Sequence, residues 1–174
     1  MLEALARGLR YAGGVLSPEA ARDLGTTGPA ARASGATLDV RRDHAYGFYK
    51  ELDFQVVHRT AGDARARFEV RADEIQESLN LIEQLVHRMP GGPLVQHLGP
   101  LPSGTWGFAM VESPRGLSSH WLRFDERGRV SDWRVRSASH ALWPAVAQAM
   151  QGDIVPDFPL VNKSFNLCYA CCDK

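Results

Sequence analysis

GDARARFEVRADEIQESLNLIEQLVHRMP, residues 62–90, is the segment from which the fold can be worked out. Its apolar side chains recur every seven residues, with two more in the positions between them: Phe68, Ile75, Ile82 and Met89, then Leu79 and Val86. This spacing places them on one side of an α-helix. Charged side chains occupy another side, which suits water or a polar neighbour: Arg65, Arg71, Glu74, Glu77 and Glu83. We predict one long helix over about residues 62–89, ended by the Pro-Gly-Gly-Pro run at 90–93.

Shorter helices are predicted upstream of this segment. Residues 2–11 carry leucines at helical spacing, and a pair of glycines ends the pattern. Residues 17–25, SPEAARDLG, begin with a serine cap and a proline at the first helical position and end with glycine. Residues 26–46 contain glycine, proline and charged residues with little periodicity. They predict a long loop, and loops of this length tend to be functional or to lie against a partner.

After residue 105 the apolar residues take the spacing of strands. Three short runs are rich in aromatic and branched residues: WGFAMVES at 106–113, SSHWLRFDE at 118–126 and RVSDWRVRS at 129–137. The last two flank the turn residues DERG, which is typical of a β-hairpin. The pattern predicts a small antiparallel sheet or hairpin.

One more helix is predicted near the C-terminus, in SASHALWPAVAQAM at 137–150. Its cap is Ser137 or Ser139, and Pro144 is expected in its first turn, where a missing amide is harmless. Its buried residues are expected to be Leu142, Val146 and Met150. Two prolines in the tail at 153–174 predict that the tail stays out of regular helix. The expected fold is α+β and mainly helical, one domain over residues 1–174 with a cysteine-bearing tail.

Composition limits the classes of partner. The 174 residues suffice for one buried core, and lysine plus arginine equals aspartate plus glutamate at 20 each. Such a chain has no basic field for nucleic acid and no acidic tail. No apolar run reaches the roughly 18 residues that span a bilayer, and the start MLEALARGLRYAGG has no signal-peptide pattern. We expect a cytoplasmic protein without a nucleic-acid partner.

All three cysteines lie in the last seven residues: Cys168, Cys171 and Cys172. An odd, clustered set does not suit a disulfide framework and favours metal or thiol chemistry. C-x-x-C brings two sulfurs to one side of the chain, which is half of a metal site. Zinc would need further ligands, for which the candidates are Cys172, whose side chain should point away from Cys171, and the distant His120 or His140. The alternatives are buried or incidental cysteines; a thioredoxin-type dithiol lacks its βαβ context here.

A second candidate functional segment is ESPRGLSSHW, residues 112–121. Pro114 fixes the backbone before Arg115, and Gly116 allows a sharp turn after it. A guanidinium is then held rigidly at the end of a strand. Arg115 is either a fixed charge over a substrate or metal-bound ligand, or a salt-bridge anchor for the fold.

The order of several long motifs resembles a known family: TGPAARASGATLDVRRDHAYGFYKELDF, then GDARARFEVRADEIQES, then ESPRGLSSHWLRF followed by WRVRS. The chain is similar, from about residue 8 to 174, to the C-terminal half of the large subunit of membrane-associated NiFe hydrogenases and to the related D subunit of respiratory complex I. The resemblance implies an oxidoreductase component whose fold is incomplete relative to the family. The complex I relatives lack the cysteines, which favours the hydrogenase branch.

The resemblance also implies roles for three residues. Cys168 would be a terminal nickel ligand and Cys171 the thiolate that bridges to iron. Arg115 matches the arginine over the open side of the nickel-iron centre; because arginine is hard to deprotonate, a charge-positioning role is expected, with Cys168 as the alternative proton acceptor. Family subunits are trimmed a few residues after the last ligand, and Lys174 stands at that place.

The departures from the family pattern define the expected partners. The family's other two nickel thiolates lie in an N-terminal Cys-Gly-x-Cys motif that has no match here, Asn166-Leu167 replaces Asp-Pro, and Cys172 is an addition. The chain is expected to be inactive alone and to need a polypeptide with the N-terminal half and an iron-sulfur small subunit, with membrane association only through the complex. The alternatives are a metal-free complex I-like interaction subunit or a small zinc- or thiol-binding module. An exposed apolar face for the missing half is also expected.

Overall fold

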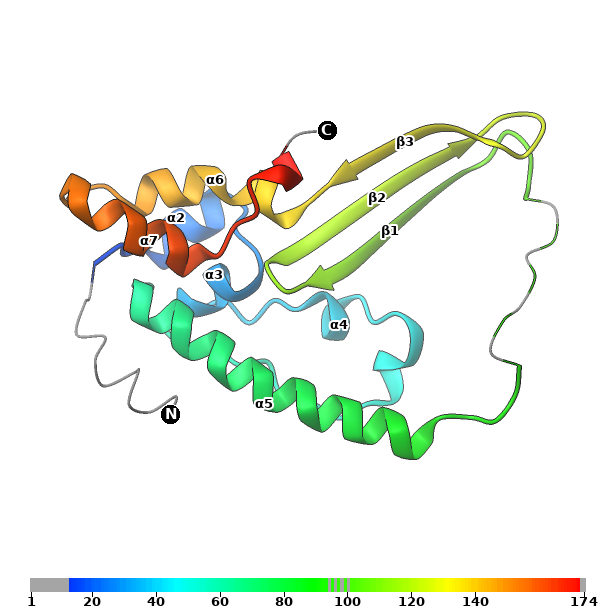
Figure 1. Cartoon of the computed structure of the whole chain (residues 1–174), viewed down its shortest axis with the longest axis horizontal. Helices are drawn as coiled ribbons and strands as arrows, with labels where there is room; N and C mark the ends of the chain where they lie inside the picture. The colour runs from blue at the N-terminus through cyan, green and yellow to red at the C-terminus, as the bar shows by residue number, and fades with distance from the viewer. Residues whose placement is uncertain (1–12, 94, 96, 98, 100, 173–174) are drawn as a thin grey trace.

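The computed structural model describes residues 13–172 except 94, 96, 98 and 100, so the helix predicted at 2–11 and Lys174 lie outside the described residues. Helices and a small antiparallel sheet make up the described chain, which confirms the expected α+β class (Figure 1). The helices are α2 (Pro18–Asp23), α3 (Gly28–Ala33), α4 (Val40–Asp43), α5 (Ala64–Arg88), α6 (Ala138–Ala149) and α7 (Phe158–Phe165), with 3₁₀ turns η1 (Gly47–Glu51), η2 (Val155–Asp157) and η3 (Ala170–Cys172). The strands are β1 (Trp106–Ser113), β2 (Gly116–Phe124) and β3 (Val130–Arg136).

The main core lies among the short helices. Small and branched side chains of α2, α3, α6 and α7 meet there: Leu16, Ala21, Ala30, Ala138, Leu142, Ala145, Val146, Ala149, Val161, Phe165 and Leu167. Alanines at the contacts let the short helices approach closely, and the branched residues fill the space between them. Leu142 and Val146 are buried as expected, and Met150 is partly buried against the same core.

The long helix α5 is confirmed. Asp63 caps it, because its Oδ1 accepts a hydrogen bond of 2.7 Å from the Ala66 amide. Ala66 and Val70 pack with Ala33 of α3 in a second, smaller core. Among the described residues, no helix combines the length and the apolar character that crossing a bilayer requires.

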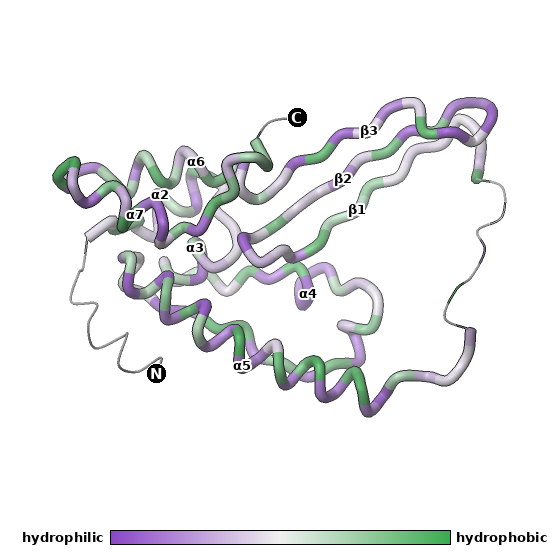
Figure 2. The backbone as a smooth tube through the Cα atoms, in the orientation of Figure 1, coloured by the Kyte–Doolittle hydropathy of each residue, from purple (hydrophilic) through white to green (hydrophobic). Residues whose placement is uncertain are grey.

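The predicted apolar side of α5 is exposed. Five side chains along it are between 55% and 68% exposed, and we call them the α5 stripe: Ile75, Leu79, Ile82, Val86 and Met89. They alternate with polar residues along the outer part of the helix (Figure 2). Near the centre of the helix, Arg71 and Glu74 make polar contacts with α7 and α3, and Ile75 lines the same cavity as both of them. The expected exposed apolar face is therefore present.

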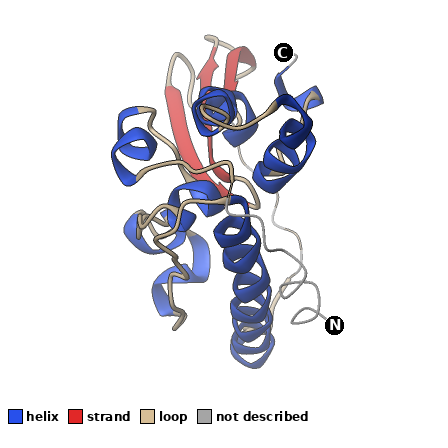
Figure 3. Cartoon of the chain, turned by 90° about the vertical axis from the view of Figure 1, so that its left-hand side faces the viewer, coloured by secondary structure: helices blue, strands red, loops and turns tan. Residues whose placement is uncertain are grey.

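The sheet has the order β1-β2-β3, and both pairs are antiparallel. The hairpin predicted between β2 and β3 is confirmed, with a register shift near Phe124. Figures 1 and 3 show the sheet and α5 leaving the helical core on different sides of the molecule. Several large apolar side chains of the sheet are exposed: Trp106, Phe108, Val111, Val130 and Trp133.

The turn between β1 and β2 rests against the start of α3. Gly28 has a φ of +67°, and a Cβ built on it would lie 2.3 Å from Gly116 Cα. The Leu117 amide donates to Thr27 Oγ1 at 3.1 Å. Only glycine permits this close approach of two backbones, and the contact fixes the position of the turn residue Arg115.

The predicted loop at 26–46 was wrong in part, because α3 and α4 lie within it. These helices have six and four residues, too short to show a period. Pro29 lies in the first turn of α3, and Asp39 caps α4 by accepting from the Arg41 amide at 2.9 Å. Burial of the alanines of α3 in the core, which sequence periodicity does not report, stabilises this segment.

Two predictions about proline were also wrong. Helix α6 begins at Ala138, capped by Ser137, so Pro144 lies in its second turn. Pro144 is exposed, as is His140, whose carbonyl loses its helical donor and faces the solvent side. In the tail, Pro159 does not prevent a helix, because it occupies the first turn of α7, where no amide donor is needed.

Candidate functional site

The cysteine-bearing tail is held against the start of α6. After α7 ends, Asn166 adopts a left-handed conformation with a φ of +55° and turns the chain. The Cys168 amide then donates to Ser139 Oγ, and Ser137 Oγ donates to the Cys171 carbonyl, both at 3.0 Å. Two hydroxyls at one helix end thus fix both ends of the C-x-x-C segment.

The structure brings the sulfurs of Cys168 and Cys171 together. The pKa of the Cys168 thiol is lowered, first by a hydrogen bond from the Cys171 side chain and then by the Cys171 backbone amide. The positive charge of Arg115 lowers it further, while partial desolvation opposes the shift. This environment favours a thiolate on Cys168, the form that binds metal ions.

Cys172 has a different environment. Its sulfur accepts a hydrogen bond of 3.0 Å from Trp143 Nε1 on α6. The Trp143 ring also lies 5.1 Å from that of Tyr169, between centroids. The Cys172 sulfur also donates to the Cys168 carbonyl at 3.6 Å, so Cys172 contacts both α6 and the start of the C-x-x-C segment.

Arg115 reaches the tail from the β1–β2 turn. Its Nε donates to the Asn166 carbonyl at 2.6 Å, which joins residues 51 positions apart. The three predicted site residues Arg115, Cys168 and Cys171 therefore lie at one place. His120 is not among them: it stacks on Trp133 and accepts from its Nε1 at 3.3 Å, and His140 is exposed on α6.

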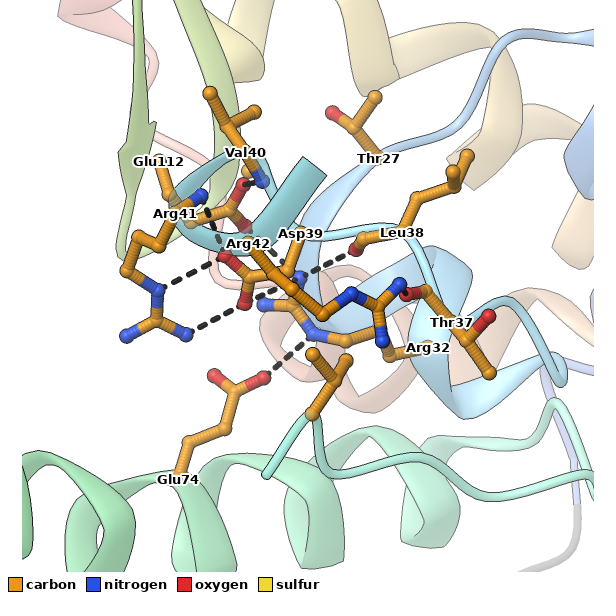
Figure 4. Close-up of polar contacts among 12 residues, drawn as sticks. Thr27, Arg32, Thr37, Leu38, Asp39, Val40, Arg41, Arg42, Glu74 and Glu112 are labelled. Atoms are coloured by element: carbon orange, nitrogen blue, oxygen red, sulfur yellow. Dashed lines mark hydrogen bonds and ion pairs between the residues drawn. The ribbon is translucent and has the colours of Figure 1, made fainter. Parts of the chain in front are cut away.

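A buried ionic cluster behind the β1–β2 turn was not predicted from the sequence (Figure 4). Arg32 of α3 is 1% exposed. Its Nε donates to Glu74 at 2.7 Å, and its Nη1 donates to Glu112 at 2.9 Å. Arg41 makes a two-pronged contact with Asp39, at 2.9 and 2.6 Å. These ion pairs connect α3, α4, α5 and β1, and the charged groups that form them are removed from water together when the chain folds.

Burial and charge act against one another in this cluster. Burial raises the pKa of Glu112, and the charge of Arg32 opposes that rise. A cavity of about 330 Å³ lies between the cluster and the tail; its walls include Arg71, Glu74, Glu112, Pro114 and Asn166. The only signal in the sequence was one arginine inside an alanine-rich segment, which alone does not indicate a buried charge.

The donor set fits part of a metal site. Cys168 and Cys171 offer two adjacent sulfurs, which suit a soft or borderline metal ion and match two positions of the implied nickel-iron centre. Within the described part of the chain, no three or more His, Cys, Asp or Glu side chains are grouped as a metal site requires. These two thiols alone do not complete a four-ligand site.

Comparison with known proteins identifies a family and several relatives. The family model of the respiratory-chain NADH dehydrogenase 49 Kd subunit matches residues 9–101 and 99–174. The chain is 35% identical, over 92% of its length, to formate hydrogenlyase subunit 5 of Escherichia coli (strain K12), of which it covers 28%. It is 42% identical, over 83% of its length, to the D 2 subunit of NADH-quinone oxidoreductase from Salinispora tropica, of which it covers 38%.

A third relative is the D subunit of F(420)H(2) dehydrogenase from Methanosarcina mazei. The two sequences are 33% identical over 92% of this chain, which covers 45% of that subunit. The chain thus spans less than half the length of each of these relatives. All three are named as subunits, and two are named as dehydrogenase or oxidoreductase subunits. Since the family model matches both halves of the sequence, the chain belongs to the family of the respiratory-chain NADH dehydrogenase 49 Kd subunit.

Proposed function

We propose that this chain supplies two thiolates and an arginine to a nickel-iron site that a further chain or segment completes, in an oxidoreductase that interconverts hydrogen and protons. The observation that carries the proposal is the meeting of Cys168, Cys171 and Arg115. They come from two segments far apart in the sequence, and a hydrogen bond through Asn166 joins the segments. The likeness to formate hydrogenlyase subunit 5 over 92% of the chain supports the hydrogenase branch.

Each of the three residues has a physical task in this proposal. Cys168 and Cys171 hold the metal as thiolates, and the lowered pKa of Cys168 favours that form of its sulfur. The positive charge of the Arg115 guanidinium offsets the negative charge of the thiolates. A nickel-iron centre bound there would supply the redox chemistry. Cys168 is the proton acceptor at the site, because its sulfur exchanges protons far more easily than a guanidinium does.

The site must be shared, since the described residues provide only two grouped ligands. The chain or segment that completes it corresponds to the part of the relatives that this chain does not cover. The α5 stripe is the surface for that chain or segment, because apolar side chains at this spacing pack into the grooves of another helix. An iron-sulfur small subunit is the proposed electron partner, and the assembly would reach the membrane only through other subunits.

A metal-free subunit of a complex I-like assembly is the second candidate. The 42% identity to a D 2 subunit of NADH-quinone oxidoreductase favours it. In that function the fold would act as a packing surface, and the cysteines would have no ligand role. A zinc- or thiol-binding module is a third candidate, for which the chain would need further ligands.

The deciding experiment is elemental analysis of the complex isolated from the native host with all its subunits. We compare the parent chain with Cys168→Ser, Cys171→Ser and the matched control Cys172→Ser. The proposal predicts nickel and iron in the parent and in the Cys172 variant, and nickel missing from the other two. The control replaces a sulfur that contacts Trp143 and the Cys168 carbonyl by a hydroxyl that can also bond to that carbonyl, so it tests for a general effect of losing a cysteine next to the site.

Two other outcomes would overturn the proposal. An intact complex without nickel would favour the metal-free subunit. Nickel retained after both ligand substitutions would show that these thiols are not ligands. Zinc bound by the isolated chain at the cysteines would instead support the third candidate.

A further inference from the structure

The last carbonyls of α7 are held by arginines from two other elements. Arg71 of α5 donates through Nη1 to the Ser164 carbonyl at 2.5 Å and through Nη2 to the Phe165 carbonyl at 2.8 Å. Arg115 takes the next carbonyl, that of Asn166, at 2.6 Å. Three successive carbonyls at the negative end of a helix thus face two guanidinium groups.

Arg71 is itself firmly placed. Its Nη1 also donates to the Arg67 carbonyl of its own helix at 3.1 Å. Arg67 in turn donates to Ser164 Oγ at 2.9 Å and lies over the Phe165 ring, 4.1 Å from the centroid. Burial lowers the pKa of Arg71 to about 10, and the nearby charge of Arg115 adds to that effect. The guanidinium is still charged at neutral pH.

Only a few residues of the chain separate these carbonyls from the thiols. Asn166 turns in the left-handed conformation, Leu167 is buried, and Cys168 follows. A shift of the α7 end would therefore move both Cys168 and the carbonyl on which Arg115 rests. The hydroxyls of α6 fix the other side of the same segment.

We propose that Arg71 is a positioning residue for the site: by holding the carbonyls of Ser164 and Phe165 it places the Asn166 carbonyl under Arg115 and the Cys168 sulfur beside that of Cys171. This inference rests on the proposed function, because it assigns Arg71 a role toward the same two ligands. Arginine suits the task since its planar fork reaches two carbonyls at once, whereas a lysine ammonium is a single point charge.

The test uses Cd²⁺, a soft ion that binds pairs of thiolates, and measures its dissociation constant from the ultraviolet thiolate-to-cadmium absorption band. Every variant of the full chain carries Cys172→Ser, so that only the two proposed ligands remain. We compare this parent with Arg71→Met, Arg71→Lys and Val70→Ala. Val70 is fully buried on the same helix but packs with Ala33 and Ala66 instead of the tail, so it reports loss of stability alone. Far-UV circular dichroism verifies that each variant is folded.

Arg71→Met should weaken Cd²⁺ binding by about 10-fold or more, as loss of a residue that orients metal ligands commonly does. Arg71→Lys should restore part of the affinity, and Val70→Ala should bind like the parent. If the Arg71→Met variant binds Cd²⁺ as tightly as the parent, the role of Arg71 is overturned and the half-site remains. The same conclusion follows if the Arg71→Met and Val70→Ala variants lose equal affinity. A parent chain that does not bind Cd²⁺ through its two thiols would overturn the proposed half-site, and the role of Arg71 with it.

Discussion

Replacing Gly28 by alanine tests whether the β1–β2 turn is seated on α3 by direct backbone contact. The new methyl group would lie 2.3 Å from Gly116 Cα and 2.6 Å from the Arg115 carbonyl oxygen, far inside van der Waals contact. Backbone must move, since neither neighbouring atom is on a side chain. Overpacking of this kind costs about 1–3 kcal/mol. The left-handed φ of +67° adds about 1–2 kcal/mol for a residue with a Cβ, offset in part by about 0.4–1 kcal/mol from a stiffer unfolded chain.

Gly25→Ala is the matched control. Gly25 has a similar φ of +59°, but a Cβ there would meet nothing within 4 Å. Gly25→Ala therefore costs only the free energy of placing a residue with a Cβ at a positive φ, without the overpacking. The free energies of unfolding of the two variants should differ by about 1–3 kcal/mol. Urea denaturation followed by circular dichroism measures both values under one set of conditions. A difference below about 0.5 kcal/mol, the usual scatter of surface substitutions, would refute the reasoning from close contact.

Three further outcomes are expected. Arg32→Met should lower the free energy of unfolding, measured by urea denaturation, by about 3–5 kcal/mol, because it leaves buried carboxylates without their partner. The control Arg65→Met, on the surface of α5, should show almost no loss of stability in the same measurement. Ile82→Glu should change stability by less than about 0.5 kcal/mol, because this side chain is 55% exposed, yet it should abolish co-purification of the completing polypeptide from the native host. Iodoacetamide should alkylate Cys168 with a pH midpoint below that of an unperturbed thiol, because a lowered pKa produces the thiolate at lower pH. Arg115→Met should move that midpoint upward, and an unchanged midpoint would exclude the charge effect.

The sequence predicted the elements whose signals are local. The long helix, the three strands and the serine cap of α2 were correct, and the cap of α6 is Ser137, one of the two serines proposed, because period, capping residues and turn glycines act within a few residues. The meeting of Arg115 with the cysteines was expected from the resemblance and not from spacing. Helix α3 was missed, since six residues show no period and its stability comes from contacts with distant segments.

The sequence by itself determined the periodic elements, the balanced charge and the presence of two thiols at metal-ligand spacing. Tertiary structure decided which part of α5 meets the chain: Arg71 and Glu74 contact partners on α7 and α3, whereas the apolar stripe, farther along the helix, stays exposed. Tertiary structure also decided that the β1–β2 turn packs on the start of α3, through a close backbone contact between the glycines at 28 and 116. The physical reason is that burial of a charge and close backbone approach depend on atoms many residues away, which no local pattern encodes.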